Sequence, residues 1–117
     1  MNIETLKTII ADFSKERDWD KFHNPKNLIM ALSSEVGELN DIFQWLSIDE
    51  SFKNLSHKNR ELAKDEIADI LIYLIRLSDK LNIDLKDAVL NKIEKNSKKY
   101  PVKLSKGNAI KYNRRNE

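Results

Sequence analysis

The chain has 117 residues, which fits one folded domain. A domain of this size is small enough that oligomerisation would help to bury its apolar surface. It has no cysteine, which excludes disulfides and thiolate metal sites, and it has 21 basic against 19 acidic residues, with a strongly basic stretch from Lys92 onward. No apolar run approaches the roughly 20 residues that cross a bilayer, and the first residues do not resemble a signal peptide. We therefore expect a soluble, cytoplasmic protein without a membrane partner.

Apolar residues at helical spacing predict a first helix that ends near Lys15. The stretch from Arg17 to Pro25 has no helical period and carries Trp19, Phe22 and His23 close together. Aromatic side chains gathered in a loop indicate a binding surface. Two other interpretations stay open: the aromatic pair could plug one end of a helix bundle, and His23 could be an ordinary hydrogen-bonding residue of the loop.

The second helix is predicted from about Lys26 to Leu46, because Asn24 can cap it and Pro25 suits its first position. Gly37 inside this helix costs about 1 kcal/mol relative to alanine. Its small size would let a ligand or another backbone approach, although a packing reason is equally possible. We expect Ser47 to Leu55 to form a polar loop.

A third helix is predicted to start near His57 with Ser56 as its cap, and from Asn59 to about Leu81 its pattern leaves almost no polar face. A domain this small can rarely surround a helix, so we expect the uncovered face to pack on another subunit, in a homodimer or homotetramer. The last main helix begins after Asp84 and runs to Lys99, where Tyr100-Pro101 ends it. The sequence thus predicts an all-α, four-helix-bundle-like fold in one domain, residues 1–117, with a loosely ordered basic tail over 103–117.

Four acidic residues lie where the two central helices should be apolar. Glu35 and Glu38 are three residues apart, as are Glu66 and Asp69, so each pair shares one helix face. Clustered carboxylates without a partner cost several kcal/mol each when desolvated, so either protons or a cation must neutralise them. Oxygen ligands select a hard cation, Mg²⁺ or Mn²⁺. The alternative, ordinary solvated charges on amphipathic helices, explains one such pair better than two.

Other features point from a metal site towards a nucleotide. Trp19 and Trp45 could stack on a base, and the lysines of the last helix could neutralise phosphates, although each lysine taken singly is typical of a solvated surface charge. The sequence has no glycine-rich phosphate loop and no convincing histidine metal site or catalytic triad. Chemistry would therefore depend on a metal that polarises phosphoryl oxygens, with a spare carboxylate taking a proton from water.

The acidic pairs and the motifs around them resemble the MazG-like superfamily of all-α nucleoside triphosphate pyrophosphohydrolases, and in particular its dCTP pyrophosphatase branch. The resemblance covers about Phe13 to Tyr112. Beyond Glu35-x-x-Glu38 and Glu66-x-x-Asp69, its motifs are Arg17-Asp18-Trp19, Phe22-His23-x-Pro25-x-Asn27-Leu28, Phe43-Gln44-Trp45, Asp69-Ile70-Leu71-Ile72-Tyr73-Leu74, Lys99-Tyr100-Pro101 and Lys111-Tyr112.

The resemblance implies an enzyme that hydrolyses a nucleoside triphosphate to the monophosphate and pyrophosphate, with water attacking the α-phosphorus, in an all-α dimer or dimer of dimers. It implies that Mg²⁺ is held, and the water oriented or deprotonated, by Glu35, Glu38, Glu66 and Asp69. Base contacts are implied for Trp19, His23 and Trp45, and a sugar contact for Tyr73. Phosphate contacts are implied for Lys92, Lys95, Asn96, Lys99 and Tyr100.

One departure from the branch affects the expected substrate. Animal dCTP pyrophosphatases have a histidine of the base pocket at the position that corresponds to Ile10 here, and losing that hydrogen bond could relax discrimination between bases. We expect a preference for dCTP or modified dCTP and a role in clearing unwanted nucleotides. The alternatives are a broad-range or dUTP-type enzyme, or a non-catalytic helical module whose basic tail binds nucleic acid or protein. The intact acidic pairs argue against the last, so we expect no nucleic-acid partner.

Overall fold

A computed structural model describes residues 1–116, and within them every regular element is helical, which confirms the all-α prediction. The elements are α1 (Ile3–Glu16), η1 (Asp20–Phe22), α2 (Pro25–Phe43), α3 (Ile48–Ser51), α4 (His57–Lys80), α5 (Leu85–Lys99), α6 (Val102–Ser105) and η2 (Tyr112–Arg114). They form two compact units, Met1–Ile83 and the chain from Asp84 onward, and each is described by itself. That the two units make one domain stays a prediction.

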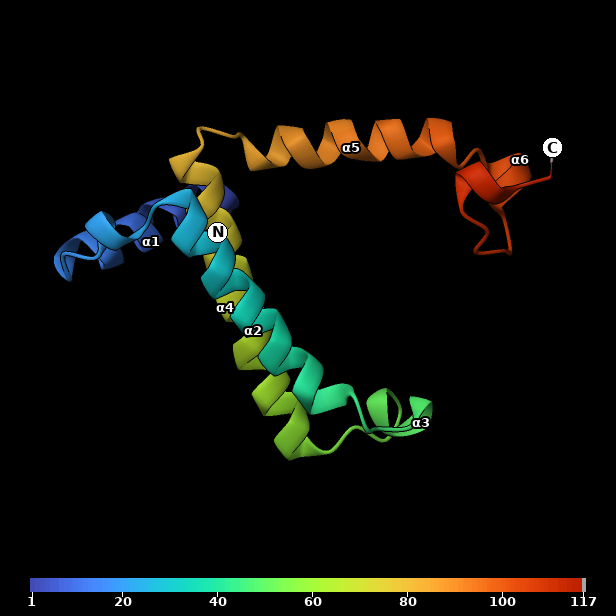
Figure 1. Ribbon diagram of the computed structural model, residues 1–117, viewed down its shortest axis with the longest axis horizontal. Helices are drawn as coiled ribbons and strands as arrows, with labels where there is room; N and C mark the ends of the chain where they lie inside the picture. Colours follow the sequence, from blue (N-terminus) through green and yellow to red (C-terminus); the bar gives the residue numbers. More distant parts are fainter. Residues whose placement is uncertain (117) are drawn as a thin grey trace. The chain divides into compact units, whose positions relative to one another are not determined.

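The first unit is built on a pair of helices. Helices α2 and α4 run side by side in opposite directions, joined by the segment that contains α3, and α1 packs against α4 (Figure 1). Buried apolar side chains are few in the described chain: Ile10 on α1, Leu28 on α2, and Ala63 and Ile75 on α4. The core of this unit is therefore a thin seam between helices.

Local capping explains where the helices begin. Asn24 accepts a hydrogen bond from the backbone N–H of Asn27 at 2.9 Å, and Ser56 accepts one from Asn59 at 3.1 Å. Such caps contribute about 1 kcal/mol each, so they set helix starts with little help from tertiary structure. Helix α2 begins as predicted, but it ends at Phe43, three residues before the predicted end at Leu46.

The polar loop predicted from Ser47 to Leu55 contains a short helix, α3. Ser47 accepts a hydrogen bond from the backbone N–H of Glu50 at 3.1 Å, and the Glu50 carboxylate accepts one from the backbone N–H of Ser47 at 3.1 Å. This reciprocal capping box supports a single turn without an apolar stripe, so hydrophobic periodicity does not indicate the helix.

Helix α4 keeps an apolar face that remains partly exposed. Ile67, Leu71 and Leu74 recur at intervals of four and three residues and are 57%, 41% and 38% exposed. That another subunit covers this face stays a prediction. Among the described residues, no helix is both long enough and apolar enough to span a membrane.

The second unit consists of α5 and the segment that follows it. The rings of Tyr100 and Tyr112 meet edge to face, with centroids 5.9 Å apart, and the ammonium of Lys99 lies 4.8 Å from the centroid of the Tyr112 ring. Arg115 donates a hydrogen bond to the carbonyl oxygen of Lys99 at 2.8 Å. The basic tail thus folds back on the end of α5, whereas its composition predicted loose order.

Candidate functional site

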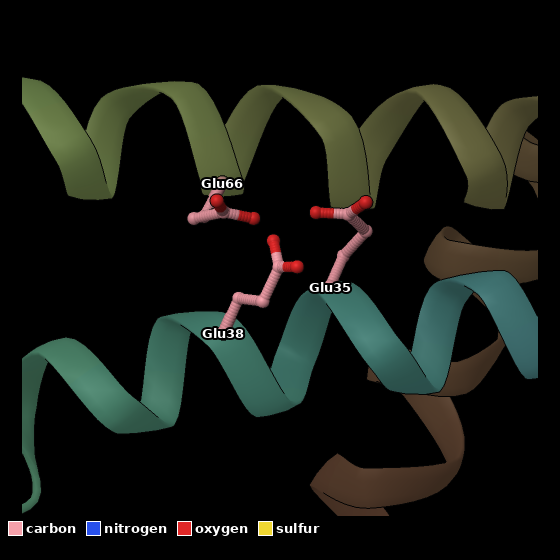
Figure 2. Close-up of side chains that lie close together, drawn as sticks. All are labelled: Glu35, Glu38 and Glu66. Atoms are coloured by element: carbon pink, nitrogen blue, oxygen red, sulfur yellow. The ribbon is translucent and has the colours of Figure 1, made fainter.

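Three carboxylates meet between the two long helices. Glu35 and Glu38 extend from α2 and Glu66 from α4, and their ends point toward one another (Figure 2). One oxygen from each residue lies within 4.8 Å of the others. The spacing of three residues brings both α2 carboxylates onto the face that α4 covers, which is what the sequence pattern predicts.

This cluster holds negative charge without a partner. The Glu66 Oε2 atom is buried and has no hydrogen-bond donor in the described chain. The neighbouring carboxylates cannot provide one while they are ionised, because an ionised carboxylate only accepts hydrogen bonds. A proton shared with Glu35 would supply the missing donor, and together with burial and the nearby Glu38 this raises the pKa of Glu66 to about 7. The cluster therefore favours binding of a proton or a cation.

The residues present fit a hard divalent cation. They offer only carboxylate oxygens, which Mg²⁺ and Mn²⁺ prefer, and a bound cation would occupy the place where Glu66 Oε2 lacks a donor. Asp69 lies about one turn further along α4 and is not part of this three-carboxylate group. Its role as a fourth ligand stays a prediction.

The raised pKa of Glu66 predicts a pH-dependent stability of the metal-free protein. Glu66 keeps its proton up to about pH 7 in the folded chain but releases it near 4.5 when unfolded. The folded state thus binds more protons in this window, so the free energy of unfolding should fall as pH rises from 4.5 to 7. Glu66→Gln cannot titrate and should flatten this fall. Thermal unfolding in EDTA over this pH range, compared between the two proteins, checks it; parallel curves would contradict it.

A cavity of about 420 Å³ lies in the first unit, close to the acidic cluster. Most of its wall is apolar and aromatic, and a few polar side chains reach into it, as in many sites for small organic ligands. It is lined by Ile9, Ile10, Phe13, Ser14, Trp19, His23, Asp69, Ile72, Tyr73 and Arg76.

Two residues relate the cavity to the acidic cluster. Asp69 and Tyr73 both line the cavity, and burial together with the charges of Glu35 and Asp69 raises the pKa of Tyr73, which keeps its hydroxyl neutral. Trp19 meets Phe13 edge to face, with ring centroids 5.8 Å apart, and remains 44% exposed. The arrangement thus places a pocket with an aromatic wall next to the acidic cluster.

Comparison with known proteins decides the family. A sequence model of the MazG-like family matches residues 30–114. The chain belongs to the MazG-like family. This confirms the resemblance inferred from the acidic pairs and their flanking motifs.

The MazG-like chain is 44% identical to dCTP pyrophosphatase 1 of Bos taurus and 40% identical to dCTP pyrophosphatase 1 of Homo sapiens, each over 94% of its length. The chain spans only 66% of the length of the Bos taurus protein and 65% of the length of the Homo sapiens protein. A crystal structure of a pyrophosphatase from Archaeoglobus fulgidus is 46% identical, with a TM-score of 0.78, over 84% of this chain and 91% of that one.

The structure brings some predicted site residues of the MazG-like chain together and leaves others apart. Trp19, His23, Asp69 and Tyr73 line one cavity, whereas Trp45 is 87% exposed and does not line it. The residues predicted to bind phosphates belong to the second unit, which is described separately, so their roles stay predictions. They are Lys92, Lys95, Asn96 and Lys99 of α5 and Tyr100, which follows it.

The sequence interpretation missed Arg76, which is 5% exposed and lines the cavity. Its Nε donates a hydrogen bond to Nδ1 of His23 at 3.2 Å, and its terminal nitrogens contact the carboxylates of Asp20 and, at 3.5 Å, Asp79. One signal could have identified it: Arg76 is the single charge in the apolar run 70–77. A charge inside such a run is rarely buried without partners.

Gly37 does not make room for another part of the described chain. A side-chain carbon added at this position would meet no atom within 4 Å. The interpretation that the glycine lets a neighbouring backbone approach is therefore wrong within one copy of the protein, and the space beside the acidic helix is open.

Proposed function

We propose that this protein is a Mg²⁺-dependent pyrophosphohydrolase that converts dCTP or modified dCTP and water to the monophosphate and pyrophosphate. The observation that carries the proposal is the three-carboxylate cluster next to a cavity with an aromatic wall. The names of the relatives support the same reaction. Its role would be to remove unwanted nucleotides before a polymerase uses them.

The acidic residues divide into metal ligands and a proton acceptor. Mg²⁺ bound by Glu35, Glu38 and Glu66 would neutralise the triphosphate and make its phosphorus more electrophilic. One of the four carboxylates, with Asp69 included, orients a water molecule and takes its proton. The water oxygen bonds to the α-phosphorus as the bond from that phosphorus to the bridging oxygen breaks, and pyrophosphate leaves.

The nucleoside occupies the cavity in this proposal. The Trp19 ring offers a stacking surface for the base, and the neutral hydroxyl of Tyr73 contacts the sugar. Trp45 also contacts the base, and phosphates are bound by Lys92, Lys95, Asn96, Lys99 and Tyr100. Since Trp45 is exposed in one copy, its contribution would require association with a second copy.

A broader substrate range is favoured by one observation. Ile10 is buried in the cavity wall, at the position where the animal enzymes resembling this chain have a histidine. An aliphatic side chain cannot hydrogen-bond a base, so several pyrimidine triphosphates could be accepted.

A substrate panel tests the function. Each deoxynucleoside and ribonucleoside triphosphate, with methylated dCTP, is incubated with Mg²⁺, Mn²⁺ or EDTA, and the products are separated by ion-exchange chromatography. We expect monophosphate and pyrophosphate, only with metal, and the highest kcat/KM for dCTP or its methylated form. Equal rates for many bases would refute the preference for cytosine, and a diphosphate plus phosphate would refute the reaction.

We also infer that the protein forms a homodimer or homotetramer through the apolar face of α4. Leu71→Glu introduces a charge into that face and should reduce the molar mass measured by light scattering after gel filtration. Lys64→Glu, an exposed site on the same helix, is the matched control and should leave the mass unchanged. A wild-type protein that is monomeric while active would contradict the inference.

A further inference from the structure

Arg76 is buried at the cavity wall with all three nitrogens of its guanidinium occupied. Nε donates to Nδ1 of His23 at 3.2 Å, one terminal nitrogen donates to Asp79 at 3.5 Å, and the other donates to Asp20. Asp20 also accepts from Lys80. Two cations thus face two carboxylates, so the charge of Arg76 is balanced within the network and its side chain is held from three sides.

This arrangement determines which nitrogen of His23 carries the proton. A guanidinium has no acceptor and does not lose its proton in proteins, so Nδ1 of His23 must be the acceptor and carries no hydrogen. A neutral imidazole then has its proton on Nε2. Burial and the charges of Arg76 and Lys80 lower the pKa of His23, which favours the neutral ring.

The Nε2 proton is available to a ligand. No hydrogen-bond acceptor for it is found among the described residues, and His23 lines the cavity. The ring also meets Trp19 edge to face, with centroids 6.4 Å apart, so a neighbour on each side limits its rotation. Ile10, on the cavity wall, offers no donor.

We propose that Arg76 is a positioning residue that holds His23 in its Nε2–H tautomer, so that His23 offers a hydrogen-bond donor to an acceptor atom of a pyrimidine base in the cavity. Cytosine has two such acceptors, N3 and O2. This inference rests on the proposed function, because it takes the ligand of the cavity to be a nucleotide. Arg76 itself uses its three nitrogens inside the protein and acts on the base only through His23.

Heteronuclear NMR of the imidazole nitrogens tests the tautomer in the wild-type protein. We expect an unprotonated Nδ1 and a protonated Nε2 at neutral pH, and a shift of the Nε2–H signal when a dCTP analogue with a methylene group between the α- and β-phosphorus atoms is added. A proton on Nδ1 would overturn the proposal. An Nε2–H signal that does not shift when the analogue is bound would overturn it as well. This measurement needs no hydrolysis, so its failure is distinct from a failure of the proposed reaction.

Kinetics separates positioning from a general effect on the fold. Arg76→Met and Lys80→Met each remove one cation from Asp20, but only the first removes the partner of His23. For dCTP we expect Arg76→Met to raise KM about tenfold, with kcat within about twofold, and to lose the single tautomer in the NMR spectrum. Lys80→Met should leave KM within about twofold of wild type. Equal KM values for the two variants would overturn the proposal.

If Arg76→Met does not fold, two further variants keep the proposal testable. Arg76→Lys retains a charged donor, so its KM should lie between that of the wild type and the about tenfold higher value expected without the donor. His23→Phe keeps a ring without a donor, so its KM should rise about as much as expected for Arg76→Met. A wild-type KM for His23→Phe would overturn the donor role.

Discussion

Replacing Glu66 by glutamine should lower kcat for pyrophosphate release at least about 100-fold, because the change replaces a carboxylate of the proposed metal site by a neutral amide of the same shape. Glu66 lies opposite the α2 carboxylates, and one of its oxygens has no other partner in the described chain. Release of pyrophosphate from dCTP over a range of Mg²⁺ concentrations, measured with a coupled phosphate assay, checks this.

The matched control for this variant is Glu61→Gln on the same helix. Glu61 is exposed and has only a loose ion pair with Lys64 at 3.8 Å, so its loss should leave kcat unchanged. Circular dichroism should show that both variants are folded, since glutamine removes a repelling charge from the cluster. Wild-type activity in folded Glu66→Gln would refute the metal site.

Removing the Trp19 ring should raise KM for dCTP about 10- to 100-fold, because stacking on an aromatic side chain contributes about 1–3 kcal/mol per base. Trp19 lines the cavity and leaves part of its ring exposed. Trp19→Ala should change kcat far less than KM, since the ring is not among the groups that act on the phosphorus. Steady-state kinetics with dCTP measures both constants.

Phe22→Ala is the control for the loss of an aromatic ring from the same segment. Phe22 is exposed, lies under the ammonium of Lys21 at 5.3 Å from the ring centroid, and does not line the cavity. Its KM should match that of the wild type. If both alanine variants raise KM equally, the segment supports the fold and Trp19 has no special contact with the base.

Features with a local cause could be predicted from the sequence. The starts of α2 and α4 depend on Asn24 and Ser56, whose hydrogen bonds reach only three residues ahead. The acidic cluster was predictable because Glu35 and Glu66 stand where a helix stripe requires apolar residues, an anomaly that is visible without knowing how the helices pack.

Features that depend on tertiary contacts could not be predicted. Arg76 meets His23 across 53 positions of sequence, and no periodicity links an arginine on α4 to a histidine in an irregular segment. The packing of Tyr112 on Tyr100 depends likewise on how the chain turns after α5. The role of Trp45 stays a prediction, because the ring is 87% exposed in one copy of the chain and its residue type does not show what covers it.

The phosphorus atom that water attacks distinguishes the proposed reaction from other routes of dCTP hydrolysis. The protein is incubated with dCTP in water labelled with heavy oxygen, with Mg²⁺ or with EDTA, and the products are analysed by mass spectrometry. We predict labelled dCMP and unlabelled pyrophosphate, formed only with the metal. Labelled pyrophosphate, the formation of dCDP, or equal hydrolysis in EDTA would contradict a metal-dependent attack on the α-phosphorus.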